Sequence, residues 1–375
     1  MKVLITGANG FVGKNLTAHL RMMGKDELML YDIDTEERLL DEYAEKCDFV
    51  FHLAGINRPK DEEEFMKGNF GFTGRLLDAL KAAGNKAPIV TTSSIQASLN
   101  NPYGKSKKAG EDLLFEYGRE QGAQVIIYRL PNVFGKWSRP NYNSAVATFC
   151  YNISRNLPIQ VNDADPLMRL VYIDDLLREL TLCMESKMHV GEDGFAFVPT
   201  VHEVHLKRIP ELLYGFRDMR ENLQVPDFAD GFEKKLYSTY LSFLPEDDFA
   251  YGLKGHADNR GSFTEFIRTP ERGQVSINVS KPGITKGEHW HHTKNEKFLV
   301  VKGEGIISFR KIGDEKIISY RVSGDELKVV DIPCGYTHNI TNVGSEDMVT
   351  VMWANEAFDP EHPDTFYEKV DIKDE

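Results

Sequence analysis

The ten-residue stretch GEHWHHTKNE contains three of the eleven histidines of the chain and two glutamates. In a β-strand successive side chains point to opposite faces, so His289 and His291 would share a face. Glu296 begins the next apolar run, and His338 lies further on in the motif PCGYTHNITN. Three imidazoles and one carboxylate suit a borderline divalent metal such as zinc, manganese, iron(II) or nickel. The sequence therefore predicts a metal site formed by His289, His291, Glu296 and His338.

A second group of residues, in the segment TGANGFVG near the start of the chain, could hold a nucleotide. Gly7, Gly10 and Gly13 lie between an apolar run and a stretch with helical periodicity. Glycines at such a turn let the backbone approach a pyrophosphate, which then accepts hydrogen bonds from the amides at the helix N-terminus. Asp32 follows about 20 residues later at the end of the next apolar run, where an acid can bind the ribose hydroxyls of adenosine.

The segment SSIQASLNNPYGKSK contains Tyr103 and Lys107, four residues apart at the expected start of a helix. One helical turn places the two side chains on the same face. A neighbouring ammonium favours the phenolate, so we expect the pKa of Tyr103 to be lowered toward a value useful for proton transfer. Ser93 or Ser94, at the end of the preceding strand, could hydrogen-bond a substrate carbonyl, and the residues alone leave both serines open.

The elements that must position these residues divide the chain into two parts. In the first part, Val- and Ile-rich strands without polar alternation are separated by helical stretches, a pattern typical of a parallel sheet covered on both faces. We expect strands at 2–7, 27–32, 48–55, 87–94 and 123–130, and helices at 10–24, 73–84 and 106–122. The sequence predicts a doubly wound α/β domain over residues 1–245, ending in a lobe of mainly helices.

The periodicity changes after about residue 245. Short strands separated by glycine, proline or charged turns are expected at 263–267, 274–280, 297–303, 306–312, 317–323, 328–333 and 348–355. Many closely spaced short strands indicate a sandwich or a barrel. We therefore predict an all-β domain over residues 250–375.

Composition narrows the possible partners. The 375 residues carry a formal net charge of −13, which argues against nucleic acid or an anionic membrane surface as a partner. We expect no membrane insertion, because no run approaches the roughly 20 apolar residues needed to cross a bilayer, and the N-terminus lacks the organisation of a signal peptide. The four cysteines share no CxxC spacing, so the sequence predicts a protein of the reducing cytoplasm.

Roughly the first 240 residues resemble the extended short-chain dehydrogenase/reductases, which have a Rossmann-type fold. The resemblance rests on TGANGFVG, FHLAG, TTSS, YGKSK, RLPNVFG and RLVYIDDL. It implies that Tyr103 is the catalytic acid/base, that Lys107 holds the nicotinamide ribose and that Ser94 polarises the carbonyl, although the gap from serine to tyrosine is shorter than is usual in this family. It also implies that Asn132 and Arg169 contact the sugar nucleotide. The implied cofactor-binding residues are Gly7, Asn9, Gly10, Phe11, Val12, Gly13, Asp32, Leu53, Ala54, Gly55, Tyr103 and Lys107.

Residues from about 250 to 365 resemble the cupins, which are jelly-roll proteins. The matching positions of the two cupin motifs are Gly283, His289, His291, Glu296, Gly303, Pro333, Gly335, His338 and Asn342. The segments DNRGSFTEF and GITKGEHW are also similar to metal-free cupins that epimerise dTDP-4-keto-6-deoxysugars, which implies substrate contacts by Arg260, Glu265 and Lys286. In those epimerases the histidine that matches His289 is the catalytic base. One nitrogen cannot be both base and ligand, so the role of His289 stays open between the two.

Taken together, the two halves resemble the capsular polysaccharide synthesis enzymes in which such a reductase is fused to a cupin. The resemblance implies a homodimer that acts on a UDP-2-acetamido-2,6-dideoxy-4-hexulose. The cupin would epimerise carbon 3, and the reductase would reduce the carbon 4 ketone with NADPH or NADH to a UDP-N-acetyl-6-deoxy-talosamine, a precursor of UDP-N-acetylfucosamine. It implies one divalent metal ion per chain, with zinc favoured. The alternatives are a single-activity ketoreductase with a non-catalytic metal-binding cupin and a redox-sensing scaffold, and the Tyr103/Lys107 pair argues against the scaffold.

The acidic run that follows the second expected strand, YDIDTEERLL, generates a prediction about the cofactor. Asp32, Asp34, Glu36 and Glu37 crowd the position that the 2′-phosphate of NADPH would occupy. Two unit charges about 4 Å apart interact by about 4 kcal/mol at an effective dielectric constant of about 20, so the phosphate would be repelled. We expect NADH to be accepted at least as well as NADPH. Comparing kcat/KM for the two cofactors tests this, and a preference of about tenfold or more for NADPH would contradict it and implicate Arg38.

Overall fold

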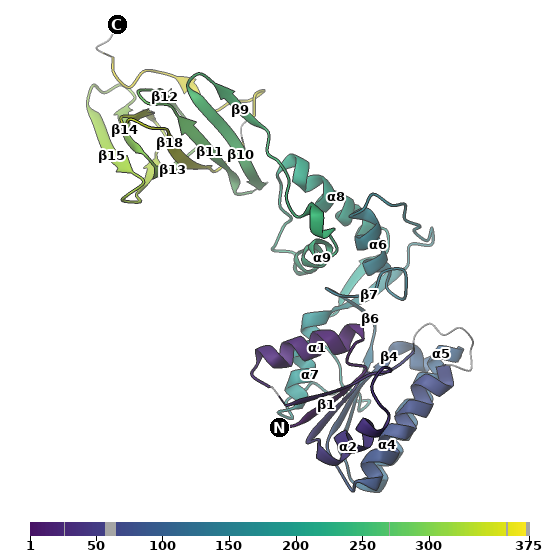
Figure 1. Ribbon diagram of the computed structural model, residues 1–375. Coiled ribbons are helices and arrows are strands. Elements are labelled where there is room, and N and C mark those ends of the chain that lie inside the picture. The colour runs from purple at the N-terminus through teal and green to yellow at the C-terminus, as the bar shows by residue number, and fades with distance from the viewer. Residues whose placement is uncertain (26, 57–64, 270, 358, 373–375) are drawn as a thin grey trace. The chain divides into compact units, whose positions relative to one another are not determined.

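The computed structural model forms two compact units (Figure 1). The first unit comprises Met1–Tyr214 and Phe228–Glu246, and the second comprises Gly215–Asp227 and Asp247–Glu375. The sequence-based division assigned all of residues 1–245 to one domain, whereas the segment Gly215–Asp227 groups with the second unit. The main-chain oxygen of Leu223 in this segment accepts a hydrogen bond from the Arg268 amide at 2.7 Å. The structure describes residues 1–25, 27–56, 65–269, 271–357 and 359–372.

A five-stranded parallel sheet forms the centre of the first unit. Its strands are short and mostly buried, as expected for a sheet that is covered on both faces. In spatial order they are β2 (Leu28–Tyr31), β1 (Val3–Thr6), β3 (Phe49–His52), β4 (Ile89–Ser94) and β5 (Val125–Leu130).

Helices cover both faces of this sheet (Figure 1). Along β1 the side chains of Val3 and Ile5 belong to one buried apolar cluster, and Leu4 belongs to the other. The first cluster includes residues of α1 (Phe11–Met22) and α7 (Ile173–Cys183), and the second includes residues of α2 (Arg38–Lys46), α4 (Phe72–Ala82) and α5 (Pro102–Gln121). The predicted doubly wound Rossmann-type fold is confirmed.

The expected lobe of helices also contains a small sheet. In that sheet β6 (Asn132–Phe134) runs parallel to β7 (Leu167–Tyr172), and β8 (His202–His205) runs antiparallel to β7. Within the described residues, the remaining helical elements are the π-turn Met66–Gly71, the 3₁₀ turns Ile95–Ser98 and Glu246–Asp248, α6 (Ala145–Ile153), α8 (Arg208–Asn222) and α9 (Gly231–Leu241). In the described part of the chain, no helix has the length and apolar character required to span a membrane.

The second unit contains two antiparallel sheets, which confirms the predicted all-β cupin fold. Apolar residues of both sheets, including Phe298, Ile307 and Ile340, form its core. The first sheet has the order β16 (Val329–Ile332), β13 (Glu296–Lys302), β18 (Met348–Ala354), β11 (Gly273–Ser280), β10 (Gly261–Thr269) and β9 (Gly255–Asp258). The second sheet has the order β15 (Ile317–Ser323), β14 (Glu304–Lys311), β17 (Tyr336–Asn342), β12 (Thr285–Trp290) and β19 (Phe366–Tyr367).

Candidate functional sites

The glycine turn between β1 and α1 forms a tight cradle. Gly7 has a φ of 69°, and a Cβ atom on it would lie 2.6 Å from the amide nitrogen of Ala54. A Cβ atom on Gly13 would lie 2.1 Å from the main-chain oxygen of Gly7. Gly10 is the N-cap of α1, and because it has no side chain, it leaves the first amides of the helix open to an anionic ligand.

Asp32 lies beside this cradle at the end of β2. Its Oδ2 accepts a hydrogen bond from the Asn9 amide at 2.7 Å, so the structure brings two of the predicted cofactor-binding residues together. The only basic side chain of the acidic run that follows, Arg38, is paired through Nε with Glu36 at 2.6 Å. Of the acidic residues in this run, Asp32 is the one that contacts the glycine turn, whereas Glu37 lies 3.6 Å from the Arg75 Nε.

The start of α5 fixes Tyr103 and Lys107. The Asn101 side chain caps the helix by accepting a hydrogen bond from the Gly104 amide at 2.7 Å, and Pro102 occupies the first helical turn. The Lys107 Nζ lies 6.0 Å from the centre of the Tyr103 ring and donates to the main-chain oxygen of Thr92 at 3.3 Å. The structure thus brings the predicted tyrosine and lysine together.

The two candidate serines at the end of β4 point to different partners. The Ser94 side chain opposes the rise in the pKa of the Tyr103 phenol as a hydrogen-bonding neighbour, and its hydroxyl accepts from the Gln96 amide at 3.2 Å. The hydroxyl of Ser93 is buried and donates to Glu111 at 2.6 Å. This alternation favours Ser94 as the serine that assists Tyr103.

The pKa of Tyr103 differs from the sequence-based expectation. Burial raises the pKa of its phenol, and the hydrogen bond with Ser94 acts in the opposite direction without reversing the shift. Burial also lowers the pKa of Lys107 to about 8, with Glu111 opposing that change. The expectation that Lys107 lowers the pKa of Tyr103 is wrong for the chain as it stands, because desolvation penalises both charged forms.

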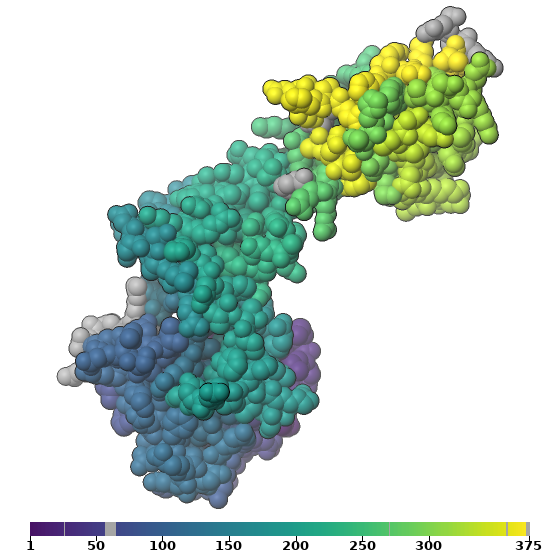
Figure 2. Space-filling view, turned by 180° about the vertical axis from the view of Figure 1, so that it is seen from behind, coloured from purple at the N-terminus to yellow at the C-terminus, as the bar shows by residue number. Residues whose placement is uncertain are grey.

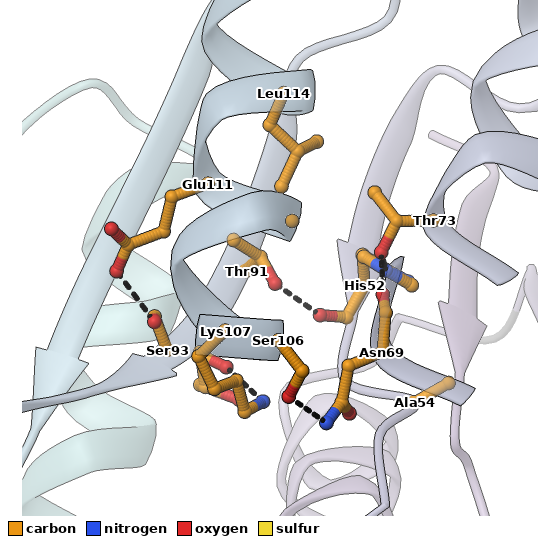
Figure 3. A pocket seen from close by; sticks show the side chains of 12 residues that line it. His52, Ala54, Asn69, Thr73, Thr91, Ser93, Ser106, Lys107, Glu111 and Leu114 are labelled. Atoms are coloured by element: carbon orange, nitrogen blue, oxygen red, sulfur yellow. Dashed lines mark hydrogen bonds between the residues drawn. The ribbon is translucent and has the colours of Figure 1, made fainter. Parts of the chain in front are cut away.

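A buried polar network behind Lys107 was not anticipated from the sequence (Figure 3). Glu111 is 2% exposed, accepts from Ser93 and forms a two-point ion pair with Arg129 at 2.6 and 3.0 Å. The spacing of Lys107 and Glu111, one helical turn apart, is the signal that could have revealed this partner. Facing them, Asn69 donates to Ser106 at 3.0 Å.

The segment after β3 contributes the other predicted cofactor residues. The Leu53 amide donates to the main-chain oxygen of Thr6 at 3.1 Å, and Ala54 adjoins Gly7. A Cβ atom on Gly55 would lie 3.3 Å from the Lys107 Nζ, so this segment runs directly beside Lys107. Phe11 and Val12, in the first turn of α1, are partly buried against the core.

Asn132 and Arg169 lie on neighbouring strands of the small sheet. Asn132 pairs with Leu170, so its side chain shares a face of the sheet with Leu170, whereas Arg169, one residue earlier on β7, points to the opposite face; both side chains are exposed. The Arg169 Nε lies 3.5 Å from Glu203. The two predicted sugar-nucleotide contacts are therefore accessible, but the register of the strands does not bring their side chains together.

The four predicted metal ligands converge in the second unit. His289 on β12 is paired with His338 on β17, His291 follows β12, and Glu296 begins β13. One ligand atom from each of the four lies within 4.8 Å of the others. The Glu296 Oε2 is 3.5 Å from the Nε2 of His291 and 3.4 Å from the Nε2 of His338.

The burial and the unmet hydrogen-bonding capacity of these ligand atoms fit a divalent cation. The His291 Nε2, the Glu296 Oε2 and the His338 Nε2 are buried without a hydrogen-bond partner among the described residues. Leaving a buried polar group unpaired costs about 1–3 kcal/mol, which a bound cation would offset. Burial lowers the pKa of His289 to about 4, with His338 adding to the effect, so that imidazole is neutral at neutral pH and able to bind a metal.

The other predicted substrate residues are in the second unit: Lys286 lies on β12, Glu265 lies on β10, and Arg260 directly precedes β10. The Lys286 Nζ donates to the Asn278 Oδ1 at 2.7 Å and to the main-chain oxygen of Val279 at 2.8 Å. Burial lowers the pKa of Lys286, and the nearby Asp258 partly opposes this. Arg260 is exposed and paired with Asp258 at 2.7 Å.

Glu265 differs from Lys286 and Arg260, which both lie near Asp258. It forms an ion pair with Arg268 on its own strand, and the structure does not pair it with Lys286 or Arg260 within the described residues.

Comparisons with known proteins agree with the two-unit fold. Residues 3–194 match the NAD dependent epimerase/dehydratase family, and residues 256–366 match the polysaccharide biosynthesis C-terminal domain. The chain is 47% identical over 366 residues to a UDP-2-acetamido-2,6-beta-L-arabino-hexul-4-ose reductase of Pseudomonas aeruginosa, with 98% of each chain covered.

Among solved structures, the chain is similar to the capsular polysaccharide assembling protein CapF of Staphylococcus aureus. The identity is 54% and the TM-score is 0.93, with 99% of this chain and 100% of that chain covered. A structure of CapF with the inhibitor 3-isopropenyl-tropolone matches with 50% identity, a TM-score of 0.88 and the same coverage. The resemblance to the fused capsular enzymes that the sequence predicts is confirmed.

The clustered ligands generate a prediction about metal content. We expect the purified chain to bind about one divalent ion, and we expect His338→Ala to weaken that binding strongly. Changes outside the ligand shell already cost about 10- to 100-fold in affinity, so loss of a ligand should cost at least as much. Elemental analysis and titration with zinc measure the effect. His256→Ala is the matched control, because His256 is exposed on β9 of the same unit, outside the four ligands; equal losses in both variants would contradict the assignment.

Proposed function

The chain belongs to the NAD dependent epimerase/dehydratase family, and on this premise we propose that it is a bifunctional sugar-nucleotide enzyme. Its first unit reduces the carbon 4 ketone of a UDP-2-acetamido-2,6-dideoxy-4-hexulose, and its second unit epimerises carbon 3 of the same sugar. The product is a UDP-N-acetyl-6-deoxy-talosamine, a precursor of UDP-N-acetylfucosamine for capsular polysaccharide. The observation that carries the proposal is the placement of Tyr103, Lys107 and Ser94 at the end of β4 and the start of α5, in a chain 47% identical to a named 4-hexulose reductase.

The reductase chemistry follows from the side chains around Tyr103. A bound nicotinamide cofactor would supply the hydride that reduces carbon 4. Ser94 hydrogen-bonds the carbonyl oxygen, and Tyr103 donates its proton to that oxygen as negative charge develops there. The raised pKa of Tyr103 keeps the phenol protonated, which suits an acid in the reducing direction. Lys107, held by the main-chain oxygen of Thr92, positions the cofactor ribose.

The epimerase chemistry depends on the same ketone. A carbonyl at carbon 4 acidifies the proton on carbon 3, so a base can remove it if negative charge on the oxygen is stabilised. A bound divalent ion would supply Lewis acidity. The convergence of His289 with His291 and His338 favours His289 as a ligand rather than as the base. Return of a proton to the opposite face of the carbon inverts the centre.

The resemblance and the site support further details of the proposal. The metal is one zinc ion per chain, the active protein is a cytoplasmic homodimer, and Asn132, Arg169, Arg260, Glu265 and Lys286 contact the UDP-sugar. Asp32 beside the glycine turn supports use of NADH as well as NADPH. The alternative is a single-activity ketoreductase whose cupin binds metal without catalysing a reaction.

The first test removes the proton donor. We expect Tyr103→Phe to lower the rate of ketone reduction by about 10²- to 10⁴-fold, the usual contribution of a positioned acid, while cofactor binding is retained. Tyr117→Phe is the control. It removes a hydroxyl from the same helix, and the Tyr117 hydroxyl donates to the main-chain oxygen of Asn85. Oxidation of the reduced cofactor measures the rate. If Tyr103→Phe consumed reduced cofactor at nearly the wild-type rate, the reductase assignment would fail.

The second test separates the bifunctional enzyme from its alternative. In deuterium oxide without nicotinamide cofactor, we expect the chain to exchange the carbon 3 proton of the 4-keto substrate, because the epimerase needs no hydride. Nuclear magnetic resonance of the recovered sugar measures the exchange. Tyr103→Phe should exchange at the wild-type rate, since its site lies in the first unit. A chain that reduces the ketone but exchanges no deuterium would establish the single-activity alternative.

A further inference from the structure

His291 is held from behind by a residue far away in the sequence. Its Nδ1 makes a hydrogen bond of 2.5 Å with the main-chain oxygen of Asp364, 73 residues later. A carbonyl can only accept, so His291 carries its proton on Nδ1. The Nε2 of the same ring therefore presents its lone pair to Glu296 and His338, where the proposed metal ion lies.

The carboxylate of Asp364 fixes the loop between His291 and Glu296. It accepts hydrogen bonds from the amides of His292, Thr293 and Lys294 at 2.9, 2.7 and 2.8 Å. Three successive amides that point at one anion form a rigid concave arrangement. Asp364 therefore holds two parts of the metal loop at once, one with its main chain and the other with its side chain.

The residues after Asp364 include β19, the edge strand that pairs with β12. We call Asp364–Val370 the C-terminal strap. Within it, Tyr367 pairs with His289 and Phe366 pairs with Trp290. In the space-filling view the C-terminal residues, in yellow, lie against the surface of the second unit (Figure 2).

The strap also secures a strained residue next to His289. Glu288 has a φ of 62°, a left-handed conformation that is unfavourable for a residue with a side chain. It lies at the irregularity where β12 shifts register between Gly287 and His289. Its Oε2 accepts from the Val370 amide at 2.7 Å, and its main-chain oxygen accepts from the Glu368 amide at 3.0 Å.

Arg310 anchors the far end of the strap. This side chain is 3% exposed and donates to the main-chain oxygens of Val370 and Lys369 at 3.0 and 2.8 Å. It also forms an ion pair with Glu368 at 2.7 Å. A buried guanidinium with this many strap partners ties the segment to β14.

We propose that the C-terminal strap is a positioning element of the metal site and that Asp364 is its central residue. Its carbonyl selects the His291 tautomer that offers Nε2 to a divalent cation, and its carboxylate sets the path of the loop from His291 to Glu296. The inference rests on the metal site proposed above and adds residues outside the four ligands to it. Asp364 acts through His291 and does not itself touch the ion.

The experiment compares three variants of the full chain. Asp364→Ala removes the carboxylate and its loop contacts, and Asp364→Asn keeps one acceptor oxygen. Asp359→Ala is the matched control, because Asp359 is an exposed carboxylate that accepts from Glu361 and His362 within its own segment. Each protein is stripped of metal with a chelator and titrated with Co²⁺ and with Zn²⁺ against a competing chelator. The Co²⁺ absorption spectrum reports ligand geometry, which a purely stabilising role of Asp364 would leave unchanged.

We expect Asp364→Ala to weaken binding by about 10- to 100-fold, the range found for partners that orient metal-binding histidines, and to alter the Co²⁺ spectrum. Asp364→Asn should lie between it and the wild type, and Asp359→Ala should match the wild type. If Asp364→Ala does not fold, Asp364→Asn decides the question by the same two measurements. Wild-type affinity and spectrum in the folded Asp364 variants would overturn the strap proposal alone. If the wild-type chain itself bound neither ion, the proposed metal site would fall with it.

Discussion

Buried polar atoms need partners, and the two sites of this chain meet that requirement in opposite ways. In the first unit, both carboxylate oxygens of Glu111 accept hydrogen bonds, one from Ser93 and both from Arg129. In the second unit, the Nε2 atoms of His291 and His338 face a carboxylate oxygen, and all three lack a hydrogen-bond partner among the described residues. A network whose members are paired holds a geometry, whereas convergent unpaired ligands favour a cation. The same constraint thus distinguishes the paired polar network behind Lys107 from the candidate metal site.

The parallel sheet explains why residues from three strands meet in the first unit. β1, β3 and β4 lie next to one another and run in the same direction, so their carboxyl ends lie at one edge of the sheet. The glycine turn follows β1, the segment of Ala54 and Gly55 follows β3, and Ser94 ends β4. Ligands of open α/β sheets bind at this edge. Gly7 and Gly55 are glycines because any side chain on them would collide with Ala54 or crowd Asn69 and Lys107.

Local patterns in the sequence were sufficient for features whose determinants lie close together along the chain. The spacing of Gly7, Gly10 and Gly13 predicted the cradle, and the strand alternation of His289 and His291 predicted two converging ligands. The direction of the Tyr103 pKa shift could not be predicted in this way, because it depends on how deeply the phenol is buried. Asp364 gave no local signal either, since its partner His291 is 73 residues away and is contacted by a main-chain oxygen that any residue possesses. The segment Gly215–Asp227 likewise groups with the second unit, where the Leu223 carbonyl accepts from the Arg268 amide, a long-range contact that periodicity does not reveal.

On the proposed function, both units use the same carbonyl, and this imposes an order on the chemistry. The proton on carbon 3 is acidic only while carbon 4 is a ketone, so reduction ends any further epimerisation. A sugar that reached Tyr103 before its carbon 3 had been inverted would be fixed as the wrong alcohol. The stereochemical purity of the product therefore depends on inversion being faster than reduction, or on selection of the inverted ketone by the first unit. In either case the geometry of the metal site has consequences for the product as well as for the rate. Because Asp364 and the strap would set that geometry, residues that touch no reacting atom would influence which sugar is made.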